Sequence, residues 1–200
     1  MKKTRLAVFV SGSGTNLQAI IDARIPSVEI VLVFSNNPGA YALERASKEG
    51  IPCEVLDHKS YASREKYDGD VLKLIEPYNI NLIALAGFMR ILSPQFVKAY
   101  KNRIINIHPA LLPSFPGVNA ARKALEAGVK HTGVTVHFVD EGVDTGPIIL
   151  QTVLPVHDDD TEESLLERIH DMEHRIYPEA IRLVASGKFR IEGKRVIALS

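Results

Sequence analysis

The chain has 200 residues, and its 24 basic side chains are balanced by 24 acidic ones. With a formal net charge of zero, no global field favours nucleic acid or an anionic membrane surface, so any anionic ligand must be held locally. The length is ample for one α/β domain with a sizeable core, and it leaves room for a second small lobe.

The sequence contains no obvious targeting or membrane segment. Its single cysteine, Cys53, cannot form an internal disulfide, which fits a reducing compartment. The apolar run after Lys2 and Lys3 is five residues long, whereas a signal peptide needs roughly 7 to 15. No run approaches the roughly 20 apolar residues of a membrane span. We therefore expect a soluble, cytoplasmic protein with neither nucleic-acid nor membrane partners.

In the first half of the chain, short apolar runs alternate with segments of helical period. This is the rhythm of βαβ units in a parallel sheet buried on both faces. The expected strands cover residues 6–10, 28–34, 53–56, 82–86 and 103–106. The last of these strands leads directly into Asn106-Ile107-His108-Pro109, and open α/β sheets bind ligands at such carboxyl ends.

The second half has a different pattern. A helix is expected over residues 118–127, and strands over 132–139 and 147–156 should pair antiparallel because residues 140–146 are too few for a helical crossover. Asp160 and Thr161 give a capping signal for a long helix, which Pro178 should kink or interrupt. Residues 189–191 and 196–199 predict a terminal hairpin.

The predicted fold is therefore α/β. We expect an open, mostly parallel twisted sheet of about seven strands, flanked by helices, with antiparallel strands and a long helix in the C-terminal half. We expect a single domain over residues 1–200, in which residues 1–100 form a phosphate-binding βαβ half.

A glycine-rich turn, Ser11-Gly12-Ser13-Gly14-Thr15-Asn16, follows the first strand and opens the first helix. Free N–H groups and the helix dipole attract phosphate at such a turn, so a nucleotide or sugar phosphate is a candidate ligand. Leu17 occupies the third glycine position of the dinucleotide fingerprint, which argues against a nicotinamide cofactor. The turn could also be simple tight packing, with Thr15 or Asn16 as an N-cap.

Asn106, His108 and Asp144 combine a carboxamide, an imidazole and a carboxylate without a nucleophilic serine or cysteine. That set suits acyl transfer to an amine without a covalent enzyme intermediate. The carboxamide and an imidazolium can stabilise the oxyanion, and we expect Asp144 to raise the pKa of His108 toward working pH. Taken singly, each residue has a structural explanation as a turn former or a hydrogen-bonded strand-end residue.

Four segments together resemble the phosphoribosylglycinamide formyltransferase family, in order and over almost the whole chain. They are Ser11 to Leu17, Ala86-Gly87-Phe88-Met89-Arg90-Ile91-Leu92, Asn106-Ile107-His108-Pro109-Ala110-Leu111-Leu112-Pro113 and Asp140 to Gly146. The resemblance implies transfer of a formyl group from 10-formyltetrahydrofolate, as co-substrate, to glycinamide ribonucleotide in purine synthesis. It implies small-molecule partners, no metal, a monomer or homodimer, and a catalytic and folate-binding half over residues 101–200.

The resemblance also implies residue roles. Asn106, His108 and Asp144 would be catalytic, and the phosphate would be bound by Gly14, Thr15 and Asn16, with Glu173 at the ribose or glycinamide end. The folate site would comprise Arg64, Met89, Arg90, Ile91, Leu92, Asn106 and Asp140. Without the resemblance, Arg64 is a solvated helix charge, and Met89 and Ile91 are core. The chain departs from the family after Gly117, where Val118-Asn119-Ala120-Ala121 lacks the histidine often found there.

Three other functions fit parts of the pattern. His170-Asp171-Met172-Glu173-His174 matches the H-x-x-E-H pattern of inverted zinc peptidases. A formyltetrahydrofolate hydrolase or a tRNA formyltransferase would share the catalytic set, but we expect each to need an additional domain for which 200 residues leave no room. A non-catalytic phosphosugar-binding module would use the glycine-rich turn and leave Asn106, His108 and Asp144 without a purpose.

Overall fold

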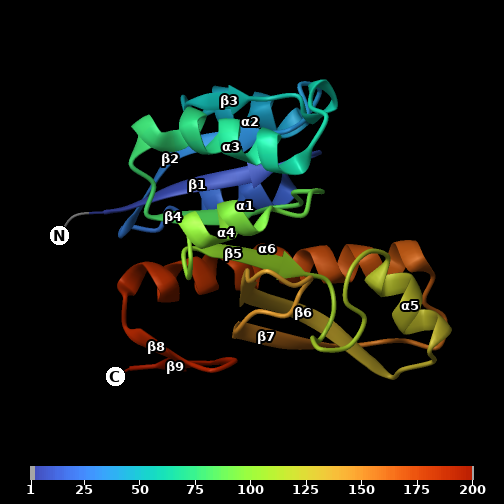
Figure 1. Cartoon of the computed structure of the whole chain (residues 1–200). Coiled ribbons are helices and arrows are strands. Elements are labelled where there is room, and N and C mark those ends of the chain that lie inside the picture. The colour runs from blue at the N-terminus through green and yellow to red at the C-terminus, as the bar shows by residue number, and fades with distance from the viewer. Residues whose placement is uncertain (1–2, 200) are drawn as a thin grey trace. The chain divides into compact units, whose positions relative to one another are not determined.

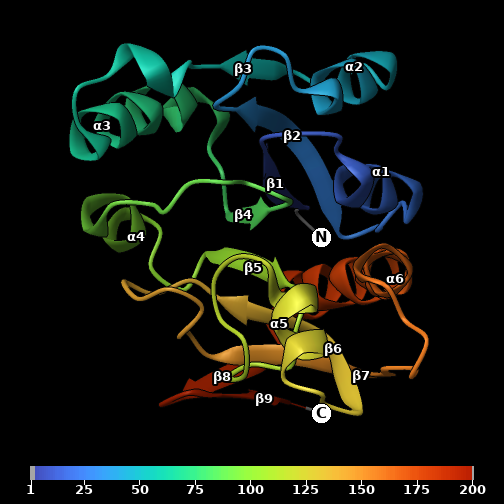
Figure 2. The same ribbon diagram turned by 90° about the vertical axis from the view of Figure 1, so that its right-hand side faces the viewer.

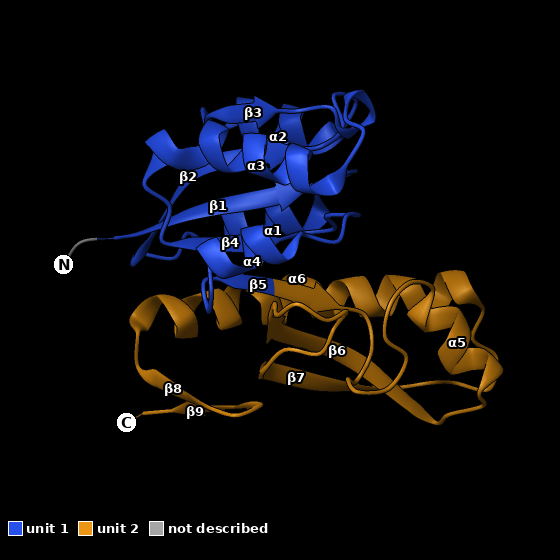
Figure 3. Ribbon diagram, in the orientation of Figure 1, with its two compact units in different colours: residues 1–105 blue, residues 106–200 orange. Residues whose placement is uncertain are grey.

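The computed structural model describes residues 3–199, and the chain divides into two compact units, residues 1–105 and 106–200 (Figure 3). The halves expected from the sequence met at residues 100 and 101, a few residues before this division. The strand β5 (Ile104–His108) carries the chain from the first unit into the second.

Unit 1 contains four parallel strands in the order β3-β2-β1-β4. They are β1 (Thr4–Val10), β2 (Val28–Ser35), β3 (Cys53–Val55) and β4 (Leu82–Leu85). The last five residues of β1 and β2 and all of β4 are buried. Continuous burial is what the unbroken apolar runs predict for strands covered on both faces.

Helices cover both faces of this sheet. Figure 2 shows α1 (Thr15–Asp22) and α2 (Tyr41–Lys48) on one side, and α3 (Arg64–Ile75) and α4 (Pro94–Ala99) on the other. The Ser63 side chain caps α3 by accepting a hydrogen bond from the Lys66 N–H at 3.2 Å. Such caps satisfy N–H groups that the first helical turn leaves without partners.

Unit 2 continues with α5 (Ala120–Glu126), the antiparallel pair β6 (His131–Phe138) and β7 (Ile148–Pro155), and the long helix α6 (Glu162–Ser186), which packs on both strands (Figure 1). The antiparallel pairing predicted for the two strands is confirmed. The connection over residues 139–147 can reverse the direction of the chain, but it is too short for the crossover that a parallel pair requires.

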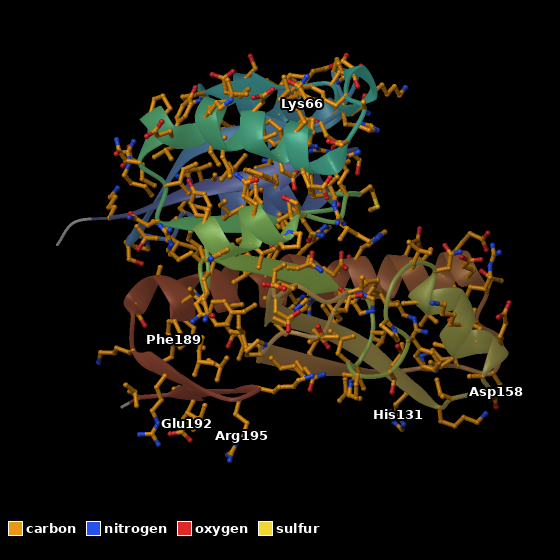
Figure 4. All side chains as sticks on the ribbon, viewed as in Figure 1. Lys66, His131, Asp158, Phe189, Glu192 and Arg195 are labelled. Carbon is orange, nitrogen blue, oxygen red and sulfur yellow. The ribbon has the colours of Figure 1, made fainter. Side chains whose placement is uncertain are left out.

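The terminal hairpin consists of β8 (Phe189–Glu192) and β9 (Arg195–Ala198), and Figure 4 labels Phe189, Glu192 and Arg195 on it. It extends the sheet because β9 pairs parallel with β7 at Ile148 and Arg195, which gives the order β6-β7-β9-β8. Residues 3–199 thus form nine strands, where the sequence predicted about seven and a separate hairpin.

Helix α6 begins at the predicted capping signal. The Thr161 hydroxyl accepts a hydrogen bond from the Ser164 N–H, and the Ser164 hydroxyl accepts one from the Thr161 N–H. Pro178 does not interrupt the helix, contrary to one of the two outcomes expected from the sequence. Proline removes one N–H donor, but buried Ile176, Tyr177, Ala180 and Ile181 pack on both sides of it and hold the helical path. Among residues 3–199, no helix combines the length and apolarity needed to cross a membrane.

Candidate active site

The end of β5 presents Asn106 and His108. Because successive side chains of a strand point to opposite faces, these two residues, separated by Ile107, lie on the same face. The His108 side chain is almost completely buried, with 4% of the residue exposed. A polar residue buried to this degree requires hydrogen-bonding partners.

Both ring nitrogens of His108 face acceptors. Nδ1 lies 3.3 Å from Oδ2 of Asp144, and Nε2 lies 2.9 Å from the carbonyl oxygen of Phe115. A neutral imidazole has only one N–H, whereas an imidazolium can donate to both acceptors. The structure therefore brings His108 and Asp144 together, in a geometry that suits the charged form of the histidine.

Burial opposes that charge. Desolvation lowers the pKa of His108 below its usual value, although the Asp144 carboxylate and the Phe115 carbonyl both act to raise it. From the sequence we expected Asp144 to raise the pKa of His108 toward working pH, and the net pKa is instead lowered because the strand end lies inside the protein. Asp144 contributes in the expected direction, but burial outweighs its contribution.

Asp144 is held as a carboxylate. Burial alone would raise its pKa, but hydrogen bonds from the His137 side chain and the Gly117 N–H, with the nearby charge of His108, lower the pKa overall. The Gly117 N–H donates to Oδ2 at 2.8 Å. Oδ2 therefore contacts both the Gly117 backbone and His108.

The loop between β6 and β7 places Asp144 at this point. Asp144 has φ 55°, a left-handed conformation that aspartate tolerates better than most residues. The loop is closed by Asp140, whose Oδ1 accepts hydrogen bonds from the Thr145 hydroxyl at 2.6 Å and the Gly142 N–H at 3.1 Å. Asp140, a predicted folate-binding residue, thus also fixes the loop that carries Asp144.

His137 is a member of this cluster that sequence reasoning missed. Its Nε2 lies 3.3 Å from Nδ2 of Asn106 and 3.5 Å from Oδ1 of Asp144, and the residue is 2% exposed. It therefore bridges two of the predicted catalytic residues. The available signal was a single imidazole in the otherwise uncharged strand of residues 132–139, where a charge-capable side chain needs a buried partner.

In unit 1, the glycine-rich turn begins α1 with Gly14 as the N-cap residue, at φ 73° and without a side-chain cap. The alternative interpretation of the sequence, in which Thr15 or Asn16 is the N-cap, is therefore wrong. A Cβ atom on Gly14 would lie 2.5 Å from Cβ of Ala42, so both the backbone conformation and the close approach of α2 require glycine. Gly14 offers no side-chain cap to this helix start, where the helix dipole favours an anion.

Arg45, on α2, also contacts this turn and was not identified from the sequence. Its Nε donates to the Ser13 carbonyl at 2.8 Å, and its Nη1 donates to Oε1 of Gln18 at 3.2 Å. The guanidinium thus joins the turn to α1. In the sequence, Arg45 is one of several charges on a short amphipathic helix, and nothing there distinguishes it.

The segment after β4 alternates between exposed and inward-facing side chains. Met89 is 76% exposed and Ile91 57%, which rules out the alternative that both are core residues. The other side chains of the segment face inward. The Arg90 guanidinium lies over the Tyr67 ring, 4.7 Å from its centroid. The centroids of the Phe88 and Phe9 rings are 5.4 Å apart, and Leu92 is buried. Two large apolar side chains of one short segment are thereby presented to solvent.

The other two predicted binding residues, Arg64 and Glu173, belong to helices. Arg64 is the first residue of α3, with its side chain 41% exposed and paired with Glu65 at 3.4 Å. Glu173 is buried on α6, within the H-x-x-E-H pattern. Throughout residues 3–199, no three histidine, cysteine or carboxylate side chains are grouped so that they could hold a metal ion, so this pattern does not assemble a ligand set.

Comparison with known proteins places the chain in a family. The model of the formyl transferase family matches residues 4–181. Phosphoribosylglycinamide formyltransferase of Escherichia coli is 44% identical over 190 residues, which cover 93% of this chain and 89% of that protein. The crystal structure of glycinamide ribonucleotide transformylase 1 from Symbiobacterium toebii is 50% identical, with a TM-score of 0.96 over 99% of this chain and 95% of that one.

A longer relative contains a similar segment. The trifunctional purine biosynthetic protein adenosine-3 of Drosophila melanogaster is 49% identical over 191 residues, but this chain spans only 14% of its length. The matches to the Escherichia coli and Symbiobacterium proteins, by contrast, cover 89% and 95% of those chains, at 44% and 50% identity. This chain therefore belongs to the formyl transferase family, and within it to the phosphoribosylglycinamide formyltransferases.

Proposed function

We propose that this protein transfers the formyl group of 10-formyltetrahydrofolate to the amine of glycinamide ribonucleotide, in purine biosynthesis. The observation that carries the proposal is the cluster of buried His108 and His137 with half-buried Asp144 and Asn106. It supplies hydrogen-bond donors for an oxyanion and a fixed carboxylate beside the histidine. It contains no serine or cysteine nucleophile. The names of the full-length relatives support the same substrates.

In the proposed reaction, the substrate amine attacks the formyl carbon directly. A new carbon–nitrogen bond forms, and the formyl oxygen becomes negative in the tetrahedral intermediate. The Asn106 carboxamide and the His108 imidazolium donate to that oxygen, and one such donor contributes about 3 kcal/mol. When the bond to N10 of the folate breaks, N10 receives the proton that the attacking amine loses, relayed by a water near Asp144.

The protonation of His108 follows from the charges around it. In the free protein, burial disfavours the imidazolium. Of the groups that raise the pKa of His108, Asp144 is the anionic one. A developing oxyanion adds a second negative charge and so favours the charged form at the moment when it is needed. Before His108 can donate to a substrate through Nε2, the Phe115 carbonyl must give up its contact with that nitrogen.

The binding roles are part of the same proposal. Gly14, Thr15 and Asn16 bind the phosphate at the N-terminal end of α1, where the helix dipole favours an anion, and buried Glu173 contacts the ribose or glycinamide end. The folate is bound by Arg64, Met89, Arg90, Ile91, Leu92, Asn106 and Asp140. The exposure of Met89 and Ile91 supports this role, because the flat pterin ring would cover apolar side chains that otherwise face water.

The test is to measure conversion of 10-formyltetrahydrofolate to tetrahydrofolate with and without glycinamide ribonucleotide. We expect turnover only when the ribonucleotide is present, and a His108→Ala variant should lose most of it while remaining folded. His131→Ala is the matched control, because His131 is exposed at the start of β6. Folate release without the ribonucleotide would favour a hydrolase, and near wild-type turnover by His108→Ala would refute the catalytic assignment.

A further inference from the structure

Within unit 1, hydrogen bonds join the ends of two strands to the segment that follows a third. The Ser11 hydroxyl donates to Oδ1 of Asn36 at 2.6 Å and accepts the Met89 N–H at 2.8 Å. Nδ2 of Asn36 in turn lies 3.1 Å from Nδ1 of His58. None of Ser11, Asn36 and His58 has a role in the mechanism above.

Ser11 occupies a particular place in this set. It is the first residue of the glycine-rich turn, and its carbonyl accepts a hydrogen bond from Nδ2 of Asn37 at 3.1 Å. Its hydroxyl contacts the backbone of Met89, in the segment 87–92 that carries two exposed apolar side chains. A single serine thus touches both the turn proposed for phosphate and the segment proposed for folate.

The orientation of the serine hydroxyl is fixed. Asn36 is 4% exposed, so its amide is held in a buried position. The amide oxygen accepts the hydrogen bond that the Ser11 hydroxyl donates. The lone pairs of the serine oxygen are then left for the Met89 N–H. Because the hydroxyl hydrogen points to Asn36, the lone pairs of the serine oxygen have a fixed direction in which to accept a hydrogen bond.

The segment 87–92 forms neither helix nor strand, so its backbone conformation depends on such contacts. Phe88, Arg90 and Leu92 anchor its inward side chains. The hydrogen bond from the Met89 N–H to the Ser11 hydroxyl holds the Met89 peptide, from which the exposed side chain projects.

We propose that Ser11 is a positioning residue for the folate segment. Its hydroxyl holds the Met89 backbone so that Met89 and Ile91 are presented to the folate, and it ties that segment to the phosphate turn, so that the binding of one substrate favours binding of the other. This inference rests on the proposed function for the identity of both ligands. The Ser11 hydroxyl acts through the backbone of Met89.

The test compares Ser11→Ala with Ser11→Thr, which keeps a hydroxyl, and with Ser47→Ala, an exposed helical serine, as the matched control. Loss of one such hydrogen bond should raise KM for 10-formyltetrahydrofolate roughly fivefold to tenfold in Ser11→Ala. We expect a smaller change in KM for the ribonucleotide and in kcat. Ser11→Thr should recover most of the loss, and Ser47→Ala should behave as wild type.

Binding of tetrahydrofolate is measured separately, with and without glycinamide ribonucleotide. We expect the ribonucleotide to tighten tetrahydrofolate binding by the wild-type protein and to do so less in Ser11→Ala, because coupling between two sites is reciprocal and requires a shared element. Unchanged folate binding and an unchanged KM in Ser11→Ala would overturn the inference. Equal losses for both substrates that Ser11→Thr does not restore would also overturn it, since they indicate a general structural role.

The proposed function and this inference fail in different ways. A wild-type protein without formyl transfer refutes the function, whereas the tetrahydrofolate measurements on Ser11→Ala still decide the role of Ser11. An active wild-type protein with an unaffected Ser11→Ala variant refutes the inference alone.

Discussion

At the scale of single residues, burial and charge compete at His108. Desolvation lowers its pKa while Asp144, 3.3 Å away, raises it, and the net effect is a lowered pKa, which negative charge that develops nearby would raise. The imidazole is thus matched to a charge that exists only during the reaction. Interactions of this kind accelerate the chemical step, because they are stronger in the transition state than in the ground state.

Asp144→Asn should separate these contributions. The substitution keeps the shape of the side chain but removes the largest influence that raises the pKa of His108, so the imidazolium becomes rarer at every pH. We expect kcat to fall by at least about a hundredfold, with little change in either KM. The measurement is kcat for formyl transfer across a range of pH. A variant whose kcat stays within a few-fold of wild type would show that Asp144 does not act through His108.

His137 allows a second residue-scale prediction. It contacts both Asn106 and Asp144, so we expect it to orient the carboxamide and the carboxylate without touching the substrate. His137→Ala should lower kcat roughly tenfold to a hundredfold, and His137→Gln, which retains a donor near Nε2, should recover part of it. His131→Ala again serves as control. If both His137 variants lose activity equally while their melting temperatures fall together, the role is structural.

At the scale of elements, the strands and helices were predictable because each depends on local pattern. The buried strands β1, β2 and β4 follow from their apolar runs, and α6 from its cap and periodicity. The conformation of Asp144 and the contact between Phe115 and His108 were not predictable, because they depend on loops whose shape is set by tertiary contacts. For the same reason the sign of the His108 pKa shift was missed: it depends on how deeply the loops bury the strand end.

The turn between β1 and α1 gives a prediction at this scale. Gly14→Ala places a Cβ against Ala42 and forces alanine into a left-handed conformation, so the turn and α2 must move apart. We expect a loss of stability of about 1–3 kcal/mol and a rise of more than about tenfold in KM for the ribonucleotide. KM for the folate should change less. Denaturant titration and steady-state kinetics measure these effects.

Gly69→Ala is the matched control for that substitution. Gly69 lies inside α3, and an added Cβ there meets no atom within 4 Å. Alanine is the better helix former by about 0.5–1 kcal/mol, so the control should gain stability and keep both KM values. If Gly14→Ala behaved like Gly69→Ala, the turn would tolerate a side chain and would not be a tightly formed phosphate site.

At the scale of the whole molecule, the residues proposed for binding and catalysis are distributed along the chain. The glycine-rich turn and segment 87–92 belong to the unit of residues 1–105, and His108, His137 and Asp144 to the unit of residues 106–200. Each unit has its own buried apolar side chains, including Phe9 and Phe34 in the first and Val134 and Ile169 in the second. The residues of the proposed function therefore come from both units, whereas the cluster of His108, His137 and Asp144 forms within one of them.

The stability of the folded chain should depend on pH through two histidines, one buried and one half-buried. Burial lowers the pKa of His108 and also that of His174 on α6, so the folded state binds fewer protons than the unfolded state in the range just below their ordinary value of about 6.5. Stability rises with pH wherever the unfolded state binds more protons. Acidification through this range should therefore destabilise the fold. Asp144, whose folded pKa is lowered, contributes stability that is lost only at lower pH, as the pH falls through its folded pKa.

We expect the melting temperature of the ligand-free protein to fall as the pH is lowered from about 7.5 to about 5.5. His108→Gln should show a smaller fall, because glutamine does not titrate and one of the two proton-linked groups is lost. His131→Gln, which changes an exposed histidine, should retain the wild-type dependence. A wild-type melting temperature that increases on acidification would mean that the folded protein binds the extra protons, and that Asp144 outweighs burial at His108 after all.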